Sequence, residues 1–497
     1  MIDENIIRKN GMNLQKIINY LICLFLFLLP WQTRWIYLWG ELNGGYFEYG
    51  TLSFYGIEIL LWFIVILFAV LKIMSFLRRQ ESYKKFWQSF ALRIKKLSKK
   101  SIWFLMLYVL SLVLFGVVLF TSLNFDISLQ WVTRFIGVLC LGVVLVITAC
   151  HPRAGGDPVC KDNLIGNRFL ISLWFGAVLQ GLIAFIQFFM QWIPANKWLG
   201  WAYHSGIDGG ASVIEFADGR FLRAYGSFGS PNSLGIYLSV CLVVGLIICL
   251  KIQNSKFKIL LTVGQLLILS GLILSFSRNA WISCLIGLIV LFFIVYFNKK
   301  PKIVSFLRSL STGEVGQDLH KLSFLRRQES KCNLLFKQLF YYLILFISLF
   351  IILNPLFTSR FNLNNRLESR SVIERGNQYF ESINLLKENI LFGTGPGNYT
   401  LALSEKYPNR QIWEYQPVHN IYLLSLVELG IFGFLVYWGL ALFLIKQVFK
   451  NNKVFLAPIL VMLVAGLFDH WLFSMYTGMV LFWLIFSLSF CNKQEPV

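Results

Sequence analysis

Long apolar runs recur along the whole chain, separated by shorter polar segments. A helix of about 20 apolar residues crosses a hydrocarbon core of about 30 Å, and it can do so because it satisfies its own backbone polar groups. The pattern therefore predicts an all-α, polytopic membrane protein with about 12 transmembrane helices in one membrane domain, residues 1–497. The predicted spans are residues 16–31, 55–73, 102–121, 131–149, 169–192, 232–250, 259–275, 280–297, 339–357, 419–445, 454–468 and 472–490.

The first span rests on an uninterrupted apolar run from Ile17 to Leu29. A run of this length also suits the core of a signal peptide, but no small-residue cleavage site follows it. The segment from Pro30 to Trp35 instead has the aromatic character of a membrane interface. We therefore expect residues 16–31 to be a membrane span.

Charge predicts the orientation of the spans. With a cytoplasmic N-terminus, the cytoplasmic segments and their borders hold 32 of the 45 Lys and Arg and 9 of the 24 Asp and Glu, a net charge of +23 against −2 outside. Cytoplasmic loops of membrane proteins carry such an excess. We therefore expect both termini in the cytoplasm, with basic cytoplasmic loops at residues 74–101 and 298–338. The overall charge of +21 is then topological and gives no indication of nucleic-acid binding.

Two segments on the predicted exoplasmic side, residues 193–231 and 358–418, are long enough to hold a site. Ten of the 13 basic residues outside are Arg, whereas 23 of the 32 inside are Lys. Arg presents a planar fork that grips phosphate or carboxylate through two hydrogen bonds, and Lys does not. The excess of Arg outside indicates either an anionic ligand or ion pairs with the 15 outside carboxylates.

Two further patterns limit the interpretation. The octapeptide from Ser75 to Ser82 recurs as residues 323–330, and we interpret the copies as inserted sequence in cytoplasmic loops without an architectural role, since a solenoid would need a regular period. The nine cysteines fall in predicted spans or on the cytoplasmic side, so neither a disulfide framework nor a zinc site is expected.

The polar pair His419-Asn420 stands at the mouth of an apolar run that continues to about Ile445. This position puts His419 at the membrane surface, where water and lipid-borne substrates both have access. An unperturbed histidine can accept a proton near neutral pH, which makes His419 a candidate general base. The alternative is a residue that only caps the helix, and Pro417 suits a helix start at this point.

Other candidates lie in the exoplasmic segments. Arg223 precedes a glycine-rich stretch that ends at Asn232, where the sixth span begins. Arg278 lies in a short turn between two later spans. An Arg at a helix junction is costly to bury without an anionic partner. The segment 358–418 carries Arg360, Arg366, Arg370 and Arg375, followed by an amphipathic helix pattern at Ile373, Phe380, Ile383, Leu386 and Ile390.

The glycine-rich stretch from Gly393 to Asn398 could be mistaken for a phosphate-binding loop. It lacks the following Lys-Ser/Thr and the preceding strand of such loops. We therefore interpret it as a turn that ends a helix.

Taken together, these motifs resemble the O-antigen ligase and polymerase superfamily. The resemblance rests on their order, and covers nearly the whole chain apart from the inserted loops. The motifs are Arg223…Gly226-Ser227-Phe228…Asn232, Ser277-Arg278, Gly393-Thr394-Gly395-Pro396-Gly397-Asn398-Tyr399 and His419-Asn420…Leu423…Glu428-Leu429-Gly430…Gly433, with Phe468-Asp469-His470 and Tyr46-Phe47-Glu48-Tyr49-Gly50-Thr51 as further similar stretches.

The resemblance implies a multi-pass glycosyltransferase of the bacterial cytoplasmic (inner) membrane that needs no cofactor. Its expected partners are a polyprenyl-diphosphate-linked glycan donor, a glycan or glycolipid acceptor and membrane lipids, with the reaction on the exoplasmic face. Arg223 and Arg278 are then expected to bind the diphosphate, and His419 to activate the acceptor hydroxyl. No exoplasmic Asp-x-Asp pair is present, so we expect no metal.

Asn420, Glu428, Arg370 and Asn232 are expected to support the site. Glu428 lies about two and a half turns into its span, too far to touch the imidazole of His419. A structural role, in which its carboxylate pairs with a polar group inside the bundle, is therefore favoured for Glu428.

Several alternatives stay open from sequence. The residues do not separate a ligase, which attaches a finished glycan, from a polymerase, which joins repeat units. A transporter would place ionisable groups near the midplane of the membrane, where this chain has few, chiefly Glu428. A non-catalytic scaffold or flippase partner would not need a histidine between arginine-bearing exoplasmic segments.

Overall fold

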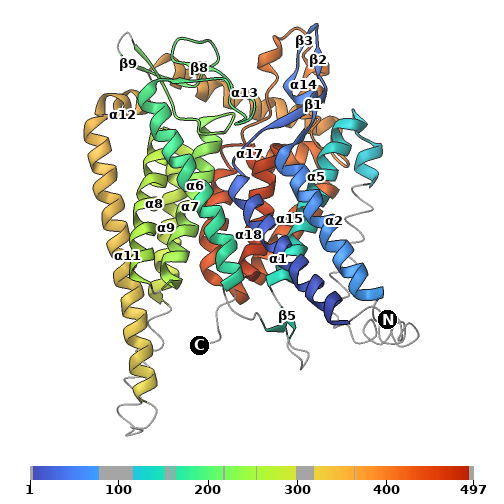
Figure 1. The fold of residues 1–497 in the computed structure, drawn as a ribbon. Helices are drawn as coiled ribbons and strands as arrows, with labels where there is room; N and C mark the ends of the chain where they lie inside the picture. Colours follow the sequence, from blue (N-terminus) through green and yellow to red (C-terminus); the bar gives the residue numbers. More distant parts are fainter. Residues whose placement is uncertain are drawn as a thin grey trace.

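The computed structural model describes residues 4–77, 116–149, 151–152, 158–159, 164–216, 219–252, 254–297, 318–362 and 364–491. Long helices run side by side, and short strands and helices gather over one end of the bundle (Figure 1). We call this end the loop face; it is built from residues 30–55, 191–230, 353–420 and 466–475. The segment 30–55 connects the end of α1 to the start of α2 on this face, whereas α18 ends at the opposite face (Figure 1).

Within the described residues, eight helices are long and apolar enough to cross a membrane, and three shorter apolar helices accompany them. This confirms an all-α polytopic membrane protein. The predicted span at 102–121 lies mostly outside the described residues. The helices are α1 (Glu4–Leu28), α2 (Gly56–Leu77), α5 (Phe125–Ala149), α6 (Leu164–Met190), α7 (Pro231–Lys251), α8 (Ser255–Leu274), α9 (Arg278–Phe297), α11 (Asp318–Ile352), α12 (Asn354–Phe361), α13 (Arg366–Glu388), α14 (Tyr399–Lys406), α15 (Ile421–Asn451), α16 (Leu456–Ala465), α17 (Trp471–Ser474) and α18 (Tyr476–Cys491).

Helix α7 forms the centre of the bundle. It is buried along almost its whole length, and α6, α8, α9 and α16 pack around it. Small residues allow this close packing: a Cβ on Gly271 of α8 would lie 2.9 Å from the Cα of Gly181 of α6. Because lipid tails are as apolar as the side chains, close backbone approach of this kind is a main source of helix association in membranes.

Short antiparallel pairs cover the loop face. Strand β1 (Arg34–Leu38) pairs with β4 (Leu52–Tyr55) through the register Arg34↔Tyr55, and this hairpin brings Arg34 close to the top of α2. On the same face, β2 (Glu41–Leu42) pairs with β3 (Gly45–Tyr46), β7 (Trp192–Ile193) with β8 (His204–Ser205), and β9 (Val213–Phe216) with β10 (Gly219–Leu222). Strand β5 (His151–Pro152) pairs with β6 (Pro158–Val159) at the opposite end of the bundle (Figure 1).

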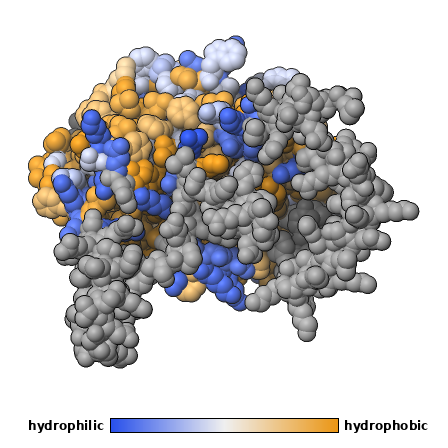
Figure 2. Space-filling view, turned by 60° about the horizontal axis from the view of Figure 1, so that its bottom comes forward, coloured by the Kyte–Doolittle hydropathy of each residue, from blue (hydrophilic) through white to orange (hydrophobic). Residues whose placement is uncertain are grey.

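The surface agrees with a membrane setting. Figure 2 looks toward the face opposite to the loop face, where apolar side chains cover much of the flank of the bundle and hydrophilic patches gather on the side turned to the viewer. Helices α7 and α15 end near this face with Lys251 and Lys450 in their last turns. Lysines at these ends are what the predicted cytoplasmic orientation would require.

Two boundaries differ from the prediction. Helix α15 begins at Ile421 rather than near Pro417, because the side chain of Asn420 accepts hydrogen bonds from the backbone N–H groups of Tyr422 and Leu423 and so sets the first turn. Helix α11 begins at Asp318, so the second octapeptide copy lies in a helix and not in a loop. The segment from Asp318 to Ile352 contains no Gly or Pro that would interrupt it.

Helix α13 turns apolar side chains outward. Ile373, Phe380, Ile383 and Ile390 are exposed, whereas Glu368, Glu381, Ser382 and Leu385 face the protein. An apolar helix face at the end of a transmembrane bundle is typical of a helix that lies in the membrane interface.

Candidate functional site

A cavity of about 620 Å³ opens beneath the loop face, within the size range of small-molecule sites. Four parts of the chain that are remote in sequence form its walls: the segment around the first hairpin, the loop from Ile193 to Ser233, the segment that precedes α15 and the segment that precedes α18. The ionisable side chains in its lining are Arg34, Glu48, His204, His419, Asp469 and His470, with the tyrosines Tyr49, Tyr55 and Tyr225.

His419 lines this cavity and does not cap the helix behind it. The cap of α15 is Asn420, whose side chain also donates to the hydroxyl of Tyr379 at 3.0 Å. The Nδ1 atom of His419 lies 3.0 Å from Oε1 of Gln378 on α13. Asn420 thus sets the entry to the helix, and His419 is not the residue that caps it.

The contact with Gln378 determines which ring nitrogen of His419 is basic. An amide oxygen is an acceptor, so in this arrangement Nδ1 carries the hydrogen and Nε2 keeps its lone pair. Burial, together with the neighbouring His470, lowers the pKa of His419 to about 4, and the carboxylate of Asp469 opposes this shift. The ring is therefore neutral at physiological pH and able to accept a proton.

His470 lies beside His419, with ring centroids 5.2 Å apart in an edge-to-face arrangement. Its Nδ1 is 2.6 Å from the hydroxyl oxygen of Ser474. Burial lowers the pKa of His470, and Asp469 acts against this. Sequence reasoning gave His470 no role, although the polar pair Asp469-His470 interrupts an apolar region as His419-Asn420 does.

Arg223 lies immediately behind the cavity wall. Its Nε donates to the carbonyl oxygen of Ser275 at 2.8 Å and its Nη2 to Oδ1 of Asn232 at 2.8 Å. Arg223 forms no ion pair with the described residues. Burial, followed by the nearby charge of Arg360, lowers the pKa of Arg223 to about 9.

Asn232 itself lines the cavity, in the first turn of α7. The hydroxyl of Ser230 caps this helix by accepting from the N–H of Ser233. A helix N-terminus carries partial positive charge. The wall at Asn232, with the guanidinium of Arg223 behind it, is therefore electropositive.

Arg278 lies in a buried ion-pair triad. Its Nη2 is 2.6 Å from Oε2 of Glu368, and Arg360 binds the other oxygen of the same carboxylate. Arg278 is not part of the cavity lining. Three guanidinium groups, those of Arg223, Arg278 and Arg360, share this region with one carboxylate, so positive charge is in excess.

Ion pairing accounts for most other arginines of the loop face. Arg366 pairs with Glu215 and Arg410 with Glu381. Arg370 is exposed on α13 and pairs with Glu374 at 2.7 Å, away from the cavity lining.

Arg375 makes no ion pair within the described part of the chain. It lies three residues before Gln378 on α13, hence on a neighbouring position of one helix face. After burial and His470, its charge also contributes to the lowered pKa of His419.

Arg34 and Glu48 are functional candidates that sequence reasoning missed. They form a two-hydrogen-bond ion pair across the first hairpin, with Nη1–Oε1 at 2.6 Å and Nη2–Oε2 at 2.8 Å, and both line the cavity. The available signal was the single Arg in the aromatic segment after the first span, together with the similar stretch that contains Glu48.

Glu428 and the glycine-rich turn form one structural unit. The carboxylate of Glu428 accepts from the N–H of Gly397 at 2.7 Å and from the N–H of Tyr399 at 3.3 Å. Helix α15 breaks at Gly430, whose φ is 62°, and a Cβ there would collide with the carbonyl oxygen of Leu391. The glycines let the turn dock on the break, and this arrangement supports the structural interpretation of Glu428.

Within the described residues, no group of three or more His, Cys, Asp and Glu side chains is arranged to hold a metal ion.

Residues 263–438 match the family model described as O-antigen ligase. The match begins in α8 and ends in α15, so it includes Arg278, the turn at 393–398 and His419, but not Arg223 or His470. It covers less than half of the chain. No curated protein sequence matches the chain.

Proposed function

From membership of the O-antigen ligase and polymerase superfamily, which the match over residues 263–438 supports, we propose that this protein is a membrane glycosyltransferase. It transfers a glycan from a polyprenyl-diphosphate carrier to an acceptor hydroxyl on the exoplasmic face of the bacterial inner membrane. The observation that carries this proposal is one cavity that combines a neutral imidazole with a free Nε2, at His419, and an electropositive wall at Asn232.

In the proposed reaction, the acceptor oxygen forms a bond to the anomeric carbon of the donor sugar while the bond from that carbon to the diphosphate oxygen breaks. The acceptor proton passes to Nε2 of His419, and the electron pair of the broken bond leaves with the diphosphate. A diphosphate beside His419 favours the protonated imidazole. Donor binding would therefore raise the basicity of His419 from its low value in the free protein.

The leaving diphosphate needs hydrogen-bond donors in an electropositive setting, because negative charge develops on its oxygen as the bond breaks. The N-terminus of α7 and the amide of Asn232 offer such donors, and Arg223 holds that amide from behind. Arg278 could bind the diphosphate only by exchanging Glu368 for it. The positive excess of Arg223, Arg278 and Arg360 over Glu368 favours this exchange.

A repeat-unit polymerase uses the same donor and the same displacement, so it is the second candidate. The two differ in the acceptor. A ligase transfers the glycan to a separate glycolipid, whereas a polymerase transfers it to another carrier-linked glycan. The description of the matching family as O-antigen ligase favours the first, and it does not favour the transporter alternative.

The test is transfer from a purified polyprenyl-diphosphate glycan to a lipid A-core glycolipid in liposomes. His419→Ala should lower transfer by about 10²–10⁴-fold, the usual contribution of a general base, without weakening donor binding. Glu405→Gln, an exposed change on α14, is the matched control. A wild-type protein that transfers no glycan to either acceptor class contradicts the proposed function. Normal transfer by His419→Ala contradicts the role of His419.

A further inference from the structure

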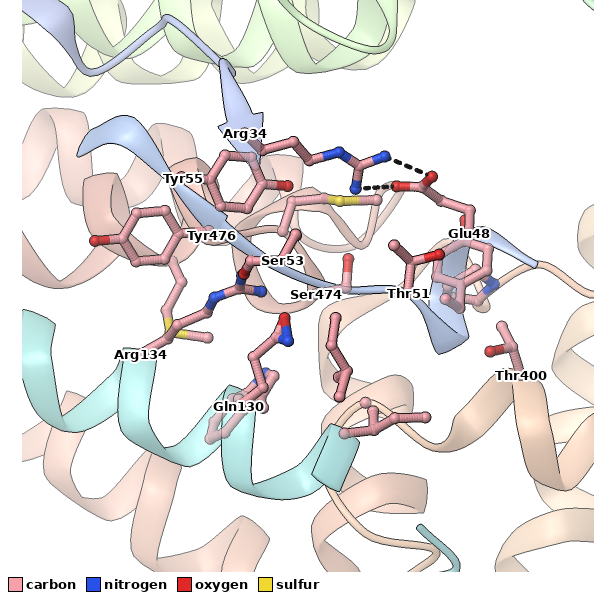
Figure 3. A pocket seen from close by; sticks show the side chains of 18 of the residues that line it. Arg34, Glu48, Thr51, Ser53, Tyr55, Gln130, Arg134, Thr400, Ser474 and Tyr476 are labelled. Atoms are coloured by element: carbon pink, nitrogen blue, oxygen red, sulfur yellow. Dashed lines mark hydrogen bonds and ion pairs between the residues drawn. The ribbon is translucent and has the colours of Figure 1, made fainter. Parts of the chain in front are cut away.

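A second, smaller pocket of about 90 Å³ adjoins the cavity. It lies between the first hairpin, α5, α14 and the segment that precedes α18 (Figure 3). Arg34, Glu48, Tyr49, Tyr55 and Met475 line both spaces, so the two lie side by side. The proposed transfer reaction assigns nothing to this pocket.

Three polar groups of the small pocket have unused hydrogen-bonding capacity. Nε2 of Gln130 and the hydroxyls of Thr400 and Tyr476 are buried and find no hydrogen-bond partner among the described residues. Figure 3 shows the Gln130 amide and the Ser474 hydroxyl pointing into the space below the Arg34–Glu48 pair. Buried polar groups are nearly always bonded, so three such groups at one pocket, from different helices, point to a polar ligand.

The pocket has no excess of positive charge, unlike the wall at Asn232, because Glu428 lines it in addition to the charges that are paired. Arg134 is bonded to Glu58 at 3.1 Å, and Arg34 is paired with Glu48. The guanidinium of Arg134 also lies 5.1 Å from the ring centre of Tyr55, which stacks on Tyr476. Paired charges and aromatic faces suit a neutral, hydroxyl-bearing ring better than a phosphate.

Two side chains, those of Ser474 and His470, connect the pocket to His419. Ser474 lines the pocket, and the hydroxyl of Ser474 contacts Nδ1 of His470, which packs against His419. A ligand edge held here would continue into the larger cavity beside His419. The volume of about 90 Å³ admits several water-sized groups but requires the rest of the ligand to lie in the cavity of about 620 Å³.

We propose that this pocket is the acceptor subsite: it binds the hydroxyl-bearing edge of the acceptor sugar and thereby presents the attacking oxygen to His419. The Gln130 amide and the Thr400 hydroxyl bond to sugar hydroxyls, Glu48 accepts from a further hydroxyl, and Tyr55 supports the ring. This inference rests on the proposed function and adds to it a place for the second substrate, opposite the diphosphate at Asn232.

The experiment compares Gln130→Ala and Thr400→Val with the wild type in the liposome assay, varying each substrate separately. Each lost hydrogen bond should raise the KM for the lipid A-core acceptor by about 2–10-fold. The KM for the donor and the kcat should stay within about twofold. Thr133→Val is the matched control, since Thr133 lies on the same helix α5 as Gln130 but on its exposed face.

A second measurement is the affinity of the protein for the lipid A-core glycolipid alone, in nanodiscs without donor. It tests the subsite independently of transfer. Gln130→Ala should weaken this binding by a similar factor while Thr133→Val leaves it unchanged. A raised KM for the donor instead, or wild-type affinity of both pocket variants, overturns the inference and leaves the proposed transferase intact. A wild type that binds the acceptor but never transfers glycan contradicts only the proposed function.

Discussion

At the scale of single residues, the environment of His419 matters more than its intrinsic pKa. Burial and His470 keep the free imidazole neutral far below physiological pH, and Gln378 directs its lone pair away from α13. A base with such a low pKa is weak on its own. The neighbouring electropositive wall therefore has two uses in the proposed reaction: it holds the diphosphate, and the diphosphate in turn strengthens the base.

Gln378→Glu should test this coupling through pH dependence. His419 must be neutral to accept a proton, so kcat/KM should rise with pH through the pKa of the free protein, which is about 4. A carboxylate at position 378 favours the protonated ring. The acid limb of the kcat/KM profile should therefore move to higher pH in Gln378→Glu.

Gln378→Met serves as the control for that change, because it removes the hydrogen bond without adding charge. It should lower kcat without moving the acid limb upward. Coincident profiles for all three proteins would contradict the assignment of that limb to His419.

At the scale of elements, the break in α15 holds in place the part of the loop face that contains the turn at 393–398. Gly430 and Gly393 meet where the turn docks, and Glu428 binds the backbone of that turn. Irregular backbone at this depth needs all its polar groups satisfied by protein. Glu428 thus orders the turn between α13 and α14, and α13 in turn carries Gln378 to His419.

Gly430→Ala should destabilise the protein by about 1–3 kcal/mol, since alanine at a φ of 62° is strained and its Cβ would collide with Leu391. Gly439→Ala is the matched control on the same helix, where a Cβ meets open space. That change should be neutral or stabilising by up to about 1 kcal/mol. Thermal unfolding of the two variants in detergent measures the difference, and equal midpoints would refute the docking argument.

At the scale of the whole molecule, all parts of the site lie at one face while lysines mark the other. If the loop face is exoplasmic, Asn409→Cys in that face should react with an impermeant maleimide in intact cells. Asn451→Cys, at the far end of α15, should react only after permeabilisation. The unsubstituted chain gives the background from its native cysteines. The opposite pattern would reverse the orientation and place every proposed site residue in the cytoplasm.

The sequence by itself determined the class of the protein and most of its spans. The length of each apolar run indicates whether that segment crosses the membrane, and both this length and the flanking basic residues can be read without knowing any tertiary contact. It also made His419 a candidate, since a polar pair at the mouth of an apolar run is visible without knowing any contact. It could not show that Asn420 takes the cap, or that a break at Gly430 receives the turn from Gly393.

Only the tertiary structure decided which charges are free. Arg278 and Arg223 look equivalent along the chain, yet Arg278 meets Glu368, 90 residues away, while Arg223 meets Asn232. His419 and His470 likewise come together only when α15 and α17 pack. Pairing energies depend on distance and burial. Neither quantity is set by neighbours in sequence, because helix packing brings the partners together.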